Sequence, residues 1–369
     1  MSYLCHVVGA RPQFIKLAAI LSPFKKHFQC KILHTGQHYD RELSQEQFDQ
    51  LAIPGADWNL GVGSAGHGAQ TGLMMEGIER VLSEERPKAV IVYGDTNSTI
   101  AGALVAAKLN IPVFHVEAGL RSYDRSTPEE INRLLTDHVS ELLFCPSDAA
   151  VRNLEKEGIT AGVHMVGDVM YDLLRIVLGG DTDGFARDSV EAQKLNSGEP
   201  VTFARREYYL ATLHRAETVD SSARLAGVLG ALAKLPKPVV FPVHPRTAKA
   251  METMTEADAG NLVTVAPVGY LKMMVLLANA RMIYTDSGGL QKEALYLKVP
   301  CATLRNVTEW VETVEHGANV LVGFDSARIG AAAGMSGPEP WPDGVYGDGG
   351  AGDRIVYTLL KHFSLGGGP

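Results

Sequence analysis

Short apolar runs alternate with longer amphipathic segments along the whole chain. The runs hold three to six residues each and are rich in β-branched and aromatic side chains, which is typical of buried strands. They lie at residues 3–8, 31–34, 89–93, 113–116, 141–145 and 164–166, and then at 208–212, 239–243, 262–265, 281–284, 301–304 and 320–322. Segments of helical length separate them, among them 100–109, 221–235 and 290–297. Strands that alternate with helices predict an α/β protein built on parallel sheets.

The length of the chain and the repetition of this pattern predict two domains. A chain of 369 residues exceeds one domain of ordinary size, and about six strand–helix units fall in each half. We place one Rossmann-like domain at residues 1–170, joined by a C-terminal helix at 354–369, and a second at 171–353. Residues 179–200 are polar and weakly patterned, so we expect a connection or a mobile surface excursion there.

Composition excludes several classes of function. The net charge of -8 gives no bulk attraction to nucleic acid or anionic lipid, and no run of about 18 apolar residues predicts a membrane span. The four cysteines are scattered without a CxxC pair, which argues against a zinc site and a disulfide scaffold. We recognise no secretory signal, so we expect a cytoplasmic protein with neither nucleic acid nor membrane as partner.

Polar residues follow most of the predicted strands. In open parallel sheets, ligands bind beyond the carboxyl ends of the strands. Taken alone, each polar residue has a structural explanation, since Asp95 can cap a helix and a lone histidine is often structural. Seven polar strand ends on one side of such sheets nevertheless predict a ligand site. They are 9–12, 35–38, 94–97, 117–119, 214–215, 244–246 and 285–289.

The segment 285–289 predicts an anion site. Ser287, Gly288 and Gly289 stand between a predicted strand and a predicted helix. Glycines let a ligand approach the backbone, and the N–H groups at a helix start favour an anion such as a diphosphate. The alternative is a tight turn with a serine cap. Neither GxxxxGK[ST] nor a GxGxxG after the first strand occurs, which disfavours ATP hydrolysis and nicotinamide chemistry.

Charged groups elsewhere can complete that site. Glu293, one turn into the same helix, suits two ribose hydroxyls, while Arg11, Lys16 and His214 can supply positive charge. Lys16 can equally be an ordinary exposed helix lysine.

Carboxylates form a second constellation. Asp95 and Glu117 end strands that we expect to be neighbours, and Glu129 and Glu130 follow Pro128 at a predicted helix start. These acids can simply complement the helix dipole. If they converge on one cleft, crowding of like charges raises one pKa, which suits acid–base catalysis.

Several segments together resemble one enzyme family, the non-hydrolysing UDP-N-acetylglucosamine 2-epimerases, over nearly the whole length. They are GARPQFIK at 9–16, TGQH at 35–38, GDTNST at 94–99, VEAGLR at 116–121, PEEINR at 128–133, HRAE at 214–217 and TDSGGLQKE at 285–293. The resemblance implies a fold like that of the two-domain GT-B glycosyltransferases, with the active site in the cleft between the domains. It also implies a UDP-sugar substrate and UDP as partners, no metal and no other cofactor, and we expect a homodimer.

The resemblance also implies roles for particular residues. The implied catalytic group is Asp95, Glu117, Glu129 and His214. The implied UDP-binding group is Arg11, Lys16, His214, Ser287, Gly288, Gly289 and Glu293. A second, regulatory UDP-sugar site, as many bacterial members have, is expected at Gln37, His38, Gln70 and Arg215. The implied reaction eliminates UDP to give a 2-acetamidoglucal and then adds UDP back after the C2 proton has changed face.

Some positions depart from the commonest pattern of the family. Gln13 stands where many members have Glu, and Ala216 stands where a second Arg is usual. With TEWVE at 308–312 and HPRT at 244–247, these variants resemble the subgroup that acts on UDP-2,3-diacetamido-2,3-dideoxyglucuronate. A uronate would need an additional cation, for which Arg246 and Arg305 are candidates.

Three other functions are compatible with these residues. A GT-B glycosyltransferase shares the fold and the phosphate site but performs no chemistry at C2. A hydrolysing epimerase releases the free sugar and UDP. A UDP-sugar sensor without catalysis is disfavoured because the catalytic group is complete.

Overall fold

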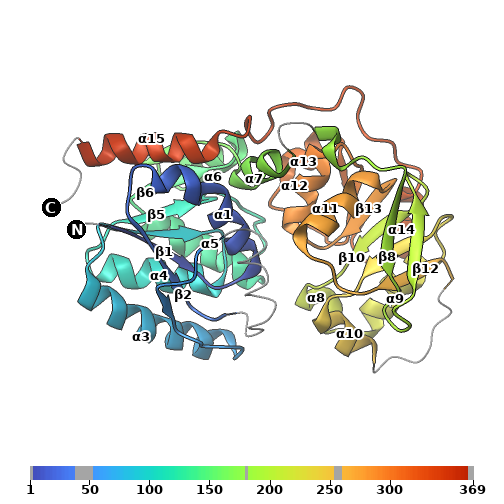
Figure 1. The fold of residues 1–369 in the computed structure, drawn as a ribbon, viewed down its shortest axis with the longest axis horizontal. Helices are drawn as coiled ribbons and strands as arrows, with labels where there is room; N and C mark the ends of the chain where they lie inside the picture. Colours follow the sequence, from blue (N-terminus) through green and yellow to red (C-terminus); the bar gives the residue numbers. More distant parts are fainter. Residues whose placement is uncertain (1–2, 38–52, 179–181, 253–259, 365–369) are drawn as a thin grey trace. The chain divides into compact units, whose positions relative to one another are not determined.

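A computed structural model describes residues 3–37, 53–178, 182–252 and 260–364 (Figure 1). The chain forms two compact units, Met1–Val177 with Gly344–Pro369 and Leu178–Asp343. The sequence analysis places the corresponding boundaries at 170 and 353. None of the described helices is long and apolar enough to cross a membrane.

The first unit is a parallel sheet with helices on both faces. Its elements are β1 (Leu4–Val8), α1 (Arg11–Lys25), β2 (Cys30–His34), β3 (Trp58–Asn59), α3 (His67–Glu85), β4 (Ala89–Tyr93), α4 (Asn97–Lys108), β5 (Val113–Val116), α5 (Pro128–Val139), β6 (Leu142–Cys145), α6 (Asp148–Lys156), β7 (Val163–Met165), α7 (Val169–Leu178) and α15 (Ala351–Ser364). The sheet order is β3-β2-β1-β4-β5-β6-β7. In Figure 1, α3 and α4 cover one face of the sheet, and α1 and α15 cover the other.

The order of the strands explains where a ligand site can form. β1 pairs in parallel with both β2 and β4, so the chain reverses its direction of winding beside β1. The loops that follow β1 and β4 therefore diverge at this point, which is where ligands bind in doubly wound sheets. The strands are buried on both faces, as the continuous apolar runs of the sequence predict.

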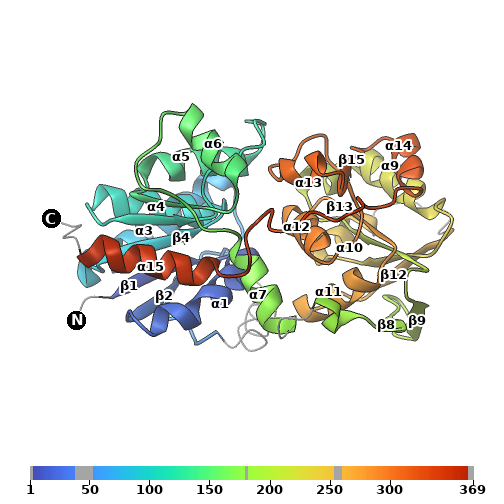
Figure 2. The same ribbon diagram turned by 90° about the horizontal axis from the view of Figure 1, so that it is seen from above.

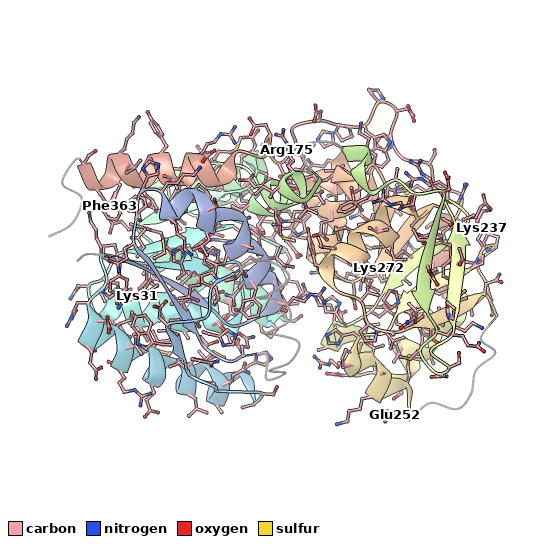
Figure 3. The ribbon with its side chains drawn as sticks, in the orientation of Figure 1. Lys31, Arg175, Lys237, Glu252, Lys272 and Phe363 are labelled. Atoms are coloured by element: carbon pink, nitrogen blue, oxygen red, sulfur yellow. The ribbon has the colours of Figure 1, made fainter. Side chains whose placement is uncertain are left out.

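The last helix, α15, packs on the first unit beside α1 (Figure 2). Phe363 near its end (Figure 3) lies 5.9 Å from the rings of both Phe28 and Phe114. At its start, the N–H groups of Ala351 and Gly352 donate to the buried carboxylate of Asp172 over 3.1 and 2.7 Å. These contacts attach the C-terminal segment to the first unit at both ends of the helix.

Asp172 gives this attachment a pH dependence. Burial raises its pKa to about 6, although the two backbone N–H groups act in the opposite direction. Since the unfolded carboxyl titrates near 3.8, the folded state binds the proton more tightly, and this group lowers stability as pH rises from about 4 to about 6. We expect Asp172→Asn to abolish this decrease, which amounts to about 2–3 kcal/mol in the free energy of unfolding. Urea unfolding of both proteins at pH 4.5 and pH 7 measures it, and an unchanged pH dependence would refute it.

The second unit repeats the architecture. Its elements are a 3₁₀ turn (Thr182–Phe185), β8 (Ser189–Gln193), β9 (Pro200–Ala204), β10 (Tyr209–Thr212), α8 (Ala216–Val219), α9 (Ser222–Ala233), β11 (Val239–Pro242), α10 (Pro245–Met251), β12 (Leu262–Val265), α11 (Tyr270–Asn279), β13 (Met282–Thr285), α12 (Gly288–Tyr296), β14 (Cys301–Thr303), α13 (Val311–Glu315), β15 (Asn319–Leu321) and α14 (Ser326–Ala332). Its parallel sheet has the order β12-β11-β10-β13-β14-β15. Winding therefore reverses between β10 and β13, and the α/β class with two parallel sheets is confirmed.

The stretch 179–200, which we expected to be part of the connection between the halves or a mobile surface excursion, follows the boundary between the units and also contains a strand. This strand, β8, pairs antiparallel with β9, which begins at Pro200. The segment alternates exposed and buried side chains, with Val190 and Ala192 buried, and its exposed positions are polar. A separate two-stranded antiparallel sheet of this kind lacks the continuous apolar run that marks the central strands of the parallel sheets.

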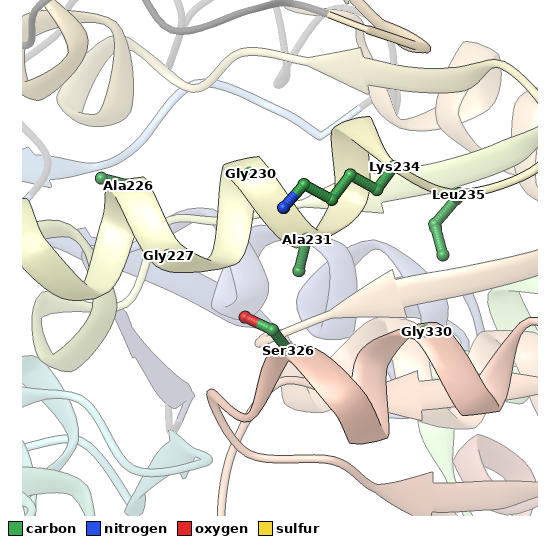
Figure 4. Close-up of a pocket in the computed structure, with 8 residues that line it drawn as sticks. All are labelled: Ala226, Gly227, Gly230, Ala231, Lys234, Leu235, Ser326 and Gly330. Carbon is green, nitrogen blue, oxygen red and sulfur yellow. The ribbon is translucent and has the colours of Figure 1, made fainter.

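A hollow of about 350 Å³ lies between α9 and α14 (Figure 4). Small residues such as Gly227, Gly230 and Gly330 line most of it, with Lys234 and Ser326 as its polar members. Its lining includes none of the predicted site residues, so it plays no part in the site described below.

Candidate functional site

The first unit brings several predicted residues to one edge of its sheet. Arg11 begins α1 just after β1, Gln37 follows β2, Asp95 follows β4 and Glu117 follows β5. Because these strands are parallel, their carboxyl ends meet at the same edge. Contacts between residues distant in sequence then arrange the side chains.

Asp95 forms an ion pair with Arg133 of α5. Arg133 also donates to Glu130 through Nε at 3.1 Å and Nη2 at 2.8 Å. The Asp95 side chain keeps 26% of its surface exposed, whereas Arg133 is buried. Asp95 is therefore a fixed carboxylate that a ligand can still reach.

Glu117 is held in an unusual backbone conformation and forms a buried ion pair with Lys16. Its φ of +73° is uncommon for a residue with a side chain and carries a strain of about 1–2 kcal/mol. Gly94 makes room for the pair, since a Cβ there would lie 2.7 Å from Lys16 Nζ and 3.4 Å from Glu117 Oε1. Strain retained beside a buried ion pair at a sheet edge is typical of functional sites.

The acids at the start of α5 have separate roles. Glu130 is buried and accepts hydrogen bonds from Ser122 N and Tyr123 N, both at 2.9 Å, and from Ser122 Oγ at 3.0 Å. Burial raises the pKa of Glu130, but these bonds and Arg133 outweigh burial and lower it. Glu130 thus fixes the loop before α5, while Glu129 is half-buried.

Two of the carboxylates expected to crowd together have cationic partners. Asp95 is paired with Arg133 and Glu117 with Lys16, so both carboxylates are compensated by cations. Sequence reasoning missed this pairing because the partners lie 38 and 101 positions apart.

The residues expected at a second site make internal hydrogen bonds. Gln37 Oε1 accepts from Ser98 N at 3.0 Å and Ser98 Oγ at 2.7 Å. The buried Gln70 donates to Gly63 O at 2.7 Å and accepts from Asn97 at 2.9 Å. His38 lies outside the described residues.

In the second unit, Asp286 organises the loop that follows β10. It accepts the N–H groups of His214 and Arg215, both at 2.9 Å, and lies 3.0 Å from His214 Nδ1. Burial raises the pKa of Asp286, but the charge of His214 and these hydrogen bonds lower it below the ordinary value. With Nδ1 engaged, Nε2 is the His214 atom that can donate to an anion, and its side chain is 39% exposed.

The helix start at Ser287 fits an anion site. Ser287 is the N-cap of α12, and its N–H donates to Thr285 Oγ1 at 3.0 Å. Gly288 and Gly289 then supply the first N–H groups of the helix, and Glu293 is buried one turn later. Free N–H groups at a helix start of this kind suit an anion, and the diphosphate site predicted from the sequence stays a prediction.

Gly288 also packs against residues that the sequence analysis did not connect with it. A Cβ at Gly288 would collide with the Glu309 carboxylate and lie 3.1 Å from Trp310 Nε1. Trp310 is stacked under Lys292, whose Nζ lies 3.8 Å from the ring centre. The start of α12 thus rests on a buried polar layer with no space for a side chain.

The two cations considered for a uronate differ in their surroundings. Arg305 is buried and lies 3.0 Å from Glu309 Oε2, so its charge is already compensated. Arg246 is exposed and donates to Asp220 over 2.7 and 2.8 Å. Of the two, Arg246 is the more accessible to a ligand.

The arrangement brings carboxylates to the strand ends of one unit and a glycine-containing helix start to a strand end of the other. The structure contains no group of three or more His, Cys, Asp or Glu residues that could hold a metal ion, within the residues it describes. Two Rossmann-type sheets with polar residues at their strand ends are typical of α/β enzymes that bind nucleotides.

Comparison with known proteins identifies the family. Residues 23–360 match the family described as UDP-N-acetylglucosamine 2-epimerase, and the chain belongs to this family of isomerases. The resemblance noted in the sequence is thereby confirmed. A UDP-N-acetylglucosamine 2-epimerase homolog of Methanococcus maripaludis is 50% identical over 88% of this chain and 89% of its own length.

Two further proteins are similar to nearly the whole chain. The UDP-2,3-diacetamido-2,3-dideoxy-D-glucuronate 2-epimerase of Pseudomonas aeruginosa is 43% identical over 96% of this chain and 98% of its own. The crystal structure of Methanocaldococcus jannaschii UDP-GlcNAc 2-epimerase in complex with UDP-GlcNAc and UDP has a TM-score of 0.85. It is 39% identical and covers 97% of this chain and 99% of that chain.

Proposed function

We propose that this chain interconverts UDP-GlcNAc and UDP-ManNAc without hydrolysis. The observation that carries the proposal is the buried Glu117–Lys16 pair at the same sheet edge as Asp95. This supports the proposal because carboxylates can transfer protons, and doubly wound sheets bind their ligands beyond these strand ends. The names of the relatives and the anion-binding start of α12 support a UDP-sugar as that ligand.

The proposed reaction proceeds by elimination and re-addition. The C2 hydrogen of the sugar has no adjacent carbonyl, so simple abstraction would leave an unstabilised carbanion. A carboxylate instead removes the C2 proton as the C1–O bond breaks. The electrons of the C2–H bond form the double bond between C1 and C2, and those of the C1–O bond leave with UDP. The resulting 2-acetamidoglucal receives a proton at C2 on the opposite face, and UDP adds back to C1. Asp95, Glu117 and Glu129 are proposed to share these proton transfers, with His214 at the leaving diphosphate.

The remaining predicted residues are proposed to hold UDP. The helix start at Ser287, Gly288 and Gly289 receives phosphate oxygens, and Arg11 and Lys16 add positive charge. The regulatory site at Gln37, Gln70 and Arg215 stays a prediction, as do a homodimer and a cytoplasmic location.

Product analysis tests the proposal. We expect NMR to detect UDP-ManNAc when the protein is incubated with pure UDP-GlcNAc and no added acceptor. No free sugar should be released. Free N-acetylmannosamine with UDP would indicate a hydrolysing epimerase, and turnover that requires an acceptor would indicate a glycosyltransferase.

UDP-2,3-diacetamido-2,3-dideoxyglucuronate is the alternative substrate. The similarity to the Pseudomonas aeruginosa enzyme and the accessible Arg246 favour it. Parallel assays with both UDP-sugars distinguish the two, because the better substrate will show the higher kcat/KM. Arg246→Ala should lower kcat/KM only for the uronate.

Glu293 provides a separate test of the UDP site. We expect Glu293→Ala to raise the Kd for UDP by about 10- to 100-fold, because hydrogen bonds from the ribose hydroxyls to a charged acceptor are lost. Isothermal titration calorimetry measures the effect, with Glu315→Ala on the exposed side of α13 as a control. Unchanged affinity would remove the ribose assignment.

A further inference from the structure

A buried charge cluster lies behind the two strand ends that carry Asp95 and Glu117. Its members are His115 of β5, Arg121, Asp137 of α5 and Glu157. The side chains of His115, Arg121 and Asp137 have no exposed surface, and that of Glu157 is 22% exposed. Neither the sequence motifs nor the proposed mechanism assigns a role to this cluster.

Hydrogen bonds within the cluster fix its charges. His115 Nδ1 lies 2.6 Å from Asp137 Oδ1, and Nε2 lies 2.8 Å from the carbonyl oxygen of Gly94. Both partners carry oxygen acceptors, so both ring nitrogens of His115 face hydrogen-bond acceptors. Burial raises the pKa of Asp137, but His115 and Arg121 outweigh it and lower the pKa, which keeps this carboxylate ionised.

One branch of the cluster leads to Asp95. Through His115, Asp137 holds the carbonyl of Gly94, the residue immediately before Asp95. Gly94 N–H in turn donates to Val116 O at 3.0 Å, which joins this loop to the residue before Glu117.

The other branch leads to Glu117. Asp137 Oδ2 accepts from Gly119 N at 3.1 Å and from Arg121 Nη1 at 2.7 Å. Arg121 is anchored on its other side by Glu157, over 2.8 and 2.7 Å. These bonds fix the residues that follow the strained φ of Glu117.

Stability alone does not explain this arrangement. Burying ions costs several kcal/mol each, and apolar replacements of buried ion pairs are often equally stable. Charged hydrogen bonds are directional, so they can orient the groups that they join. Here they end on the peptide groups of Gly94 and Gly119, which lie close in sequence to Asp95 and Glu117. Displacement of a reacting group by about 1 Å can cost about 100-fold in rate.

We propose that Asp137 is a positioning residue that sets the geometry of both Asp95 and Glu117, through His115 on one side and through Gly119 and Arg121 on the other. The inference rests on the proposed epimerase function. Asp137 never touches the sugar in this scheme, so its loss affects proton transfer and leaves UDP binding intact.

The test compares Asp137→Asn and His115→Gln with Asp172→Asn. An amide at position 137 lacks the negative charge on which both branches converge, and it can keep its bond to His115 only by donating its NH₂ to a neutral ring, so both branches are weakened. We expect kcat to fall by about 10- to 100-fold, with the Kd for UDP changed by less than about twofold. His115→Gln breaks only the branch to Gly94 and should lower kcat by about tenfold. Asp172→Asn removes another buried carboxylate of the same unit and should leave kcat unchanged.

The outcomes are distinct. Wild-type kcat in folded Asp137→Asn, or a parallel loss of kcat and UDP affinity in both variants, would overturn the proposal. If Asp137→Asn does not fold, His115→Gln decides, and wild-type kcat there would overturn it. Failure of the underlying function would appear in the wild type, as absence of C2 exchange, and would remove this inference as well.

Discussion

Glu117→Gln should lose at least about 10³-fold in kcat while its affinity for UDP stays within about twofold of the wild type. Glu117 is assigned to the sugar, so its charge matters for removing or returning the C2 proton and not for holding the nucleotide. Glutamine has the same shape and can still accept a hydrogen bond from Lys16, so the φ of +73° and the buried contact can persist. The loss should therefore appear in chemistry and not in folding.

Three measurements establish this result. Turnover is followed by NMR, UDP binding by calorimetry and folding by thermal unfolding, with Glu79→Gln on the exposed side of α3 as a control. Activity within about tenfold of the wild type would contradict the acid–base role of Glu117.

Gly288→Ala should weaken UDP binding by about 10- to 100-fold, which corresponds to about 1.4–2.7 kcal/mol. The added Cβ collides with the Glu309 carboxylate and crowds Trp310 Nε1 at 3.1 Å, so the start of α12 has to move. The N–H groups proposed to receive the diphosphate move with it.

Gly330→Ala in α14 is the matched control for this substitution. Nothing lies within 4 Å of a Cβ at Gly330, and alanine is favoured over glycine in a helix by about 0.5–1 kcal/mol. It should therefore bind UDP normally. Unchanged UDP affinity in Gly288→Ala would exclude this helix start as the diphosphate site.

Much of the fold could be predicted because a buried parallel strand leaves a continuous apolar run. β4, β5 and β12 occur at the expected residues. The two-residue β3 is too short to leave such a run, and β8 alternates polar and apolar side chains at a sheet edge. These elements are set by their neighbours in space and not by their own composition.

The strand ends that carry the candidate site residues could be predicted from the sequence, but the ion pairs of these residues could not. Parallel topology places Asp95 and Glu117 at one edge, which strand ends alone suggest. Their cationic partners come from α5 and α1, and Asp137 reaches the same loops from within α5. No local pattern marks such contacts, because each depends on how helices pack on the finished sheet.

Exchange of the C2 hydrogen with solvent tests the central proposal most directly. If UDP leaves and returns to an unsaturated sugar while carboxylates move the C2 proton, epimerisation in heavy water incorporates deuterium at C2 of the product. NMR at equilibrium should then show deuterium at C2 of both epimers. A product that keeps its original hydrogen at C2 would contradict the mechanism proposed for Asp95, Glu117 and Glu129.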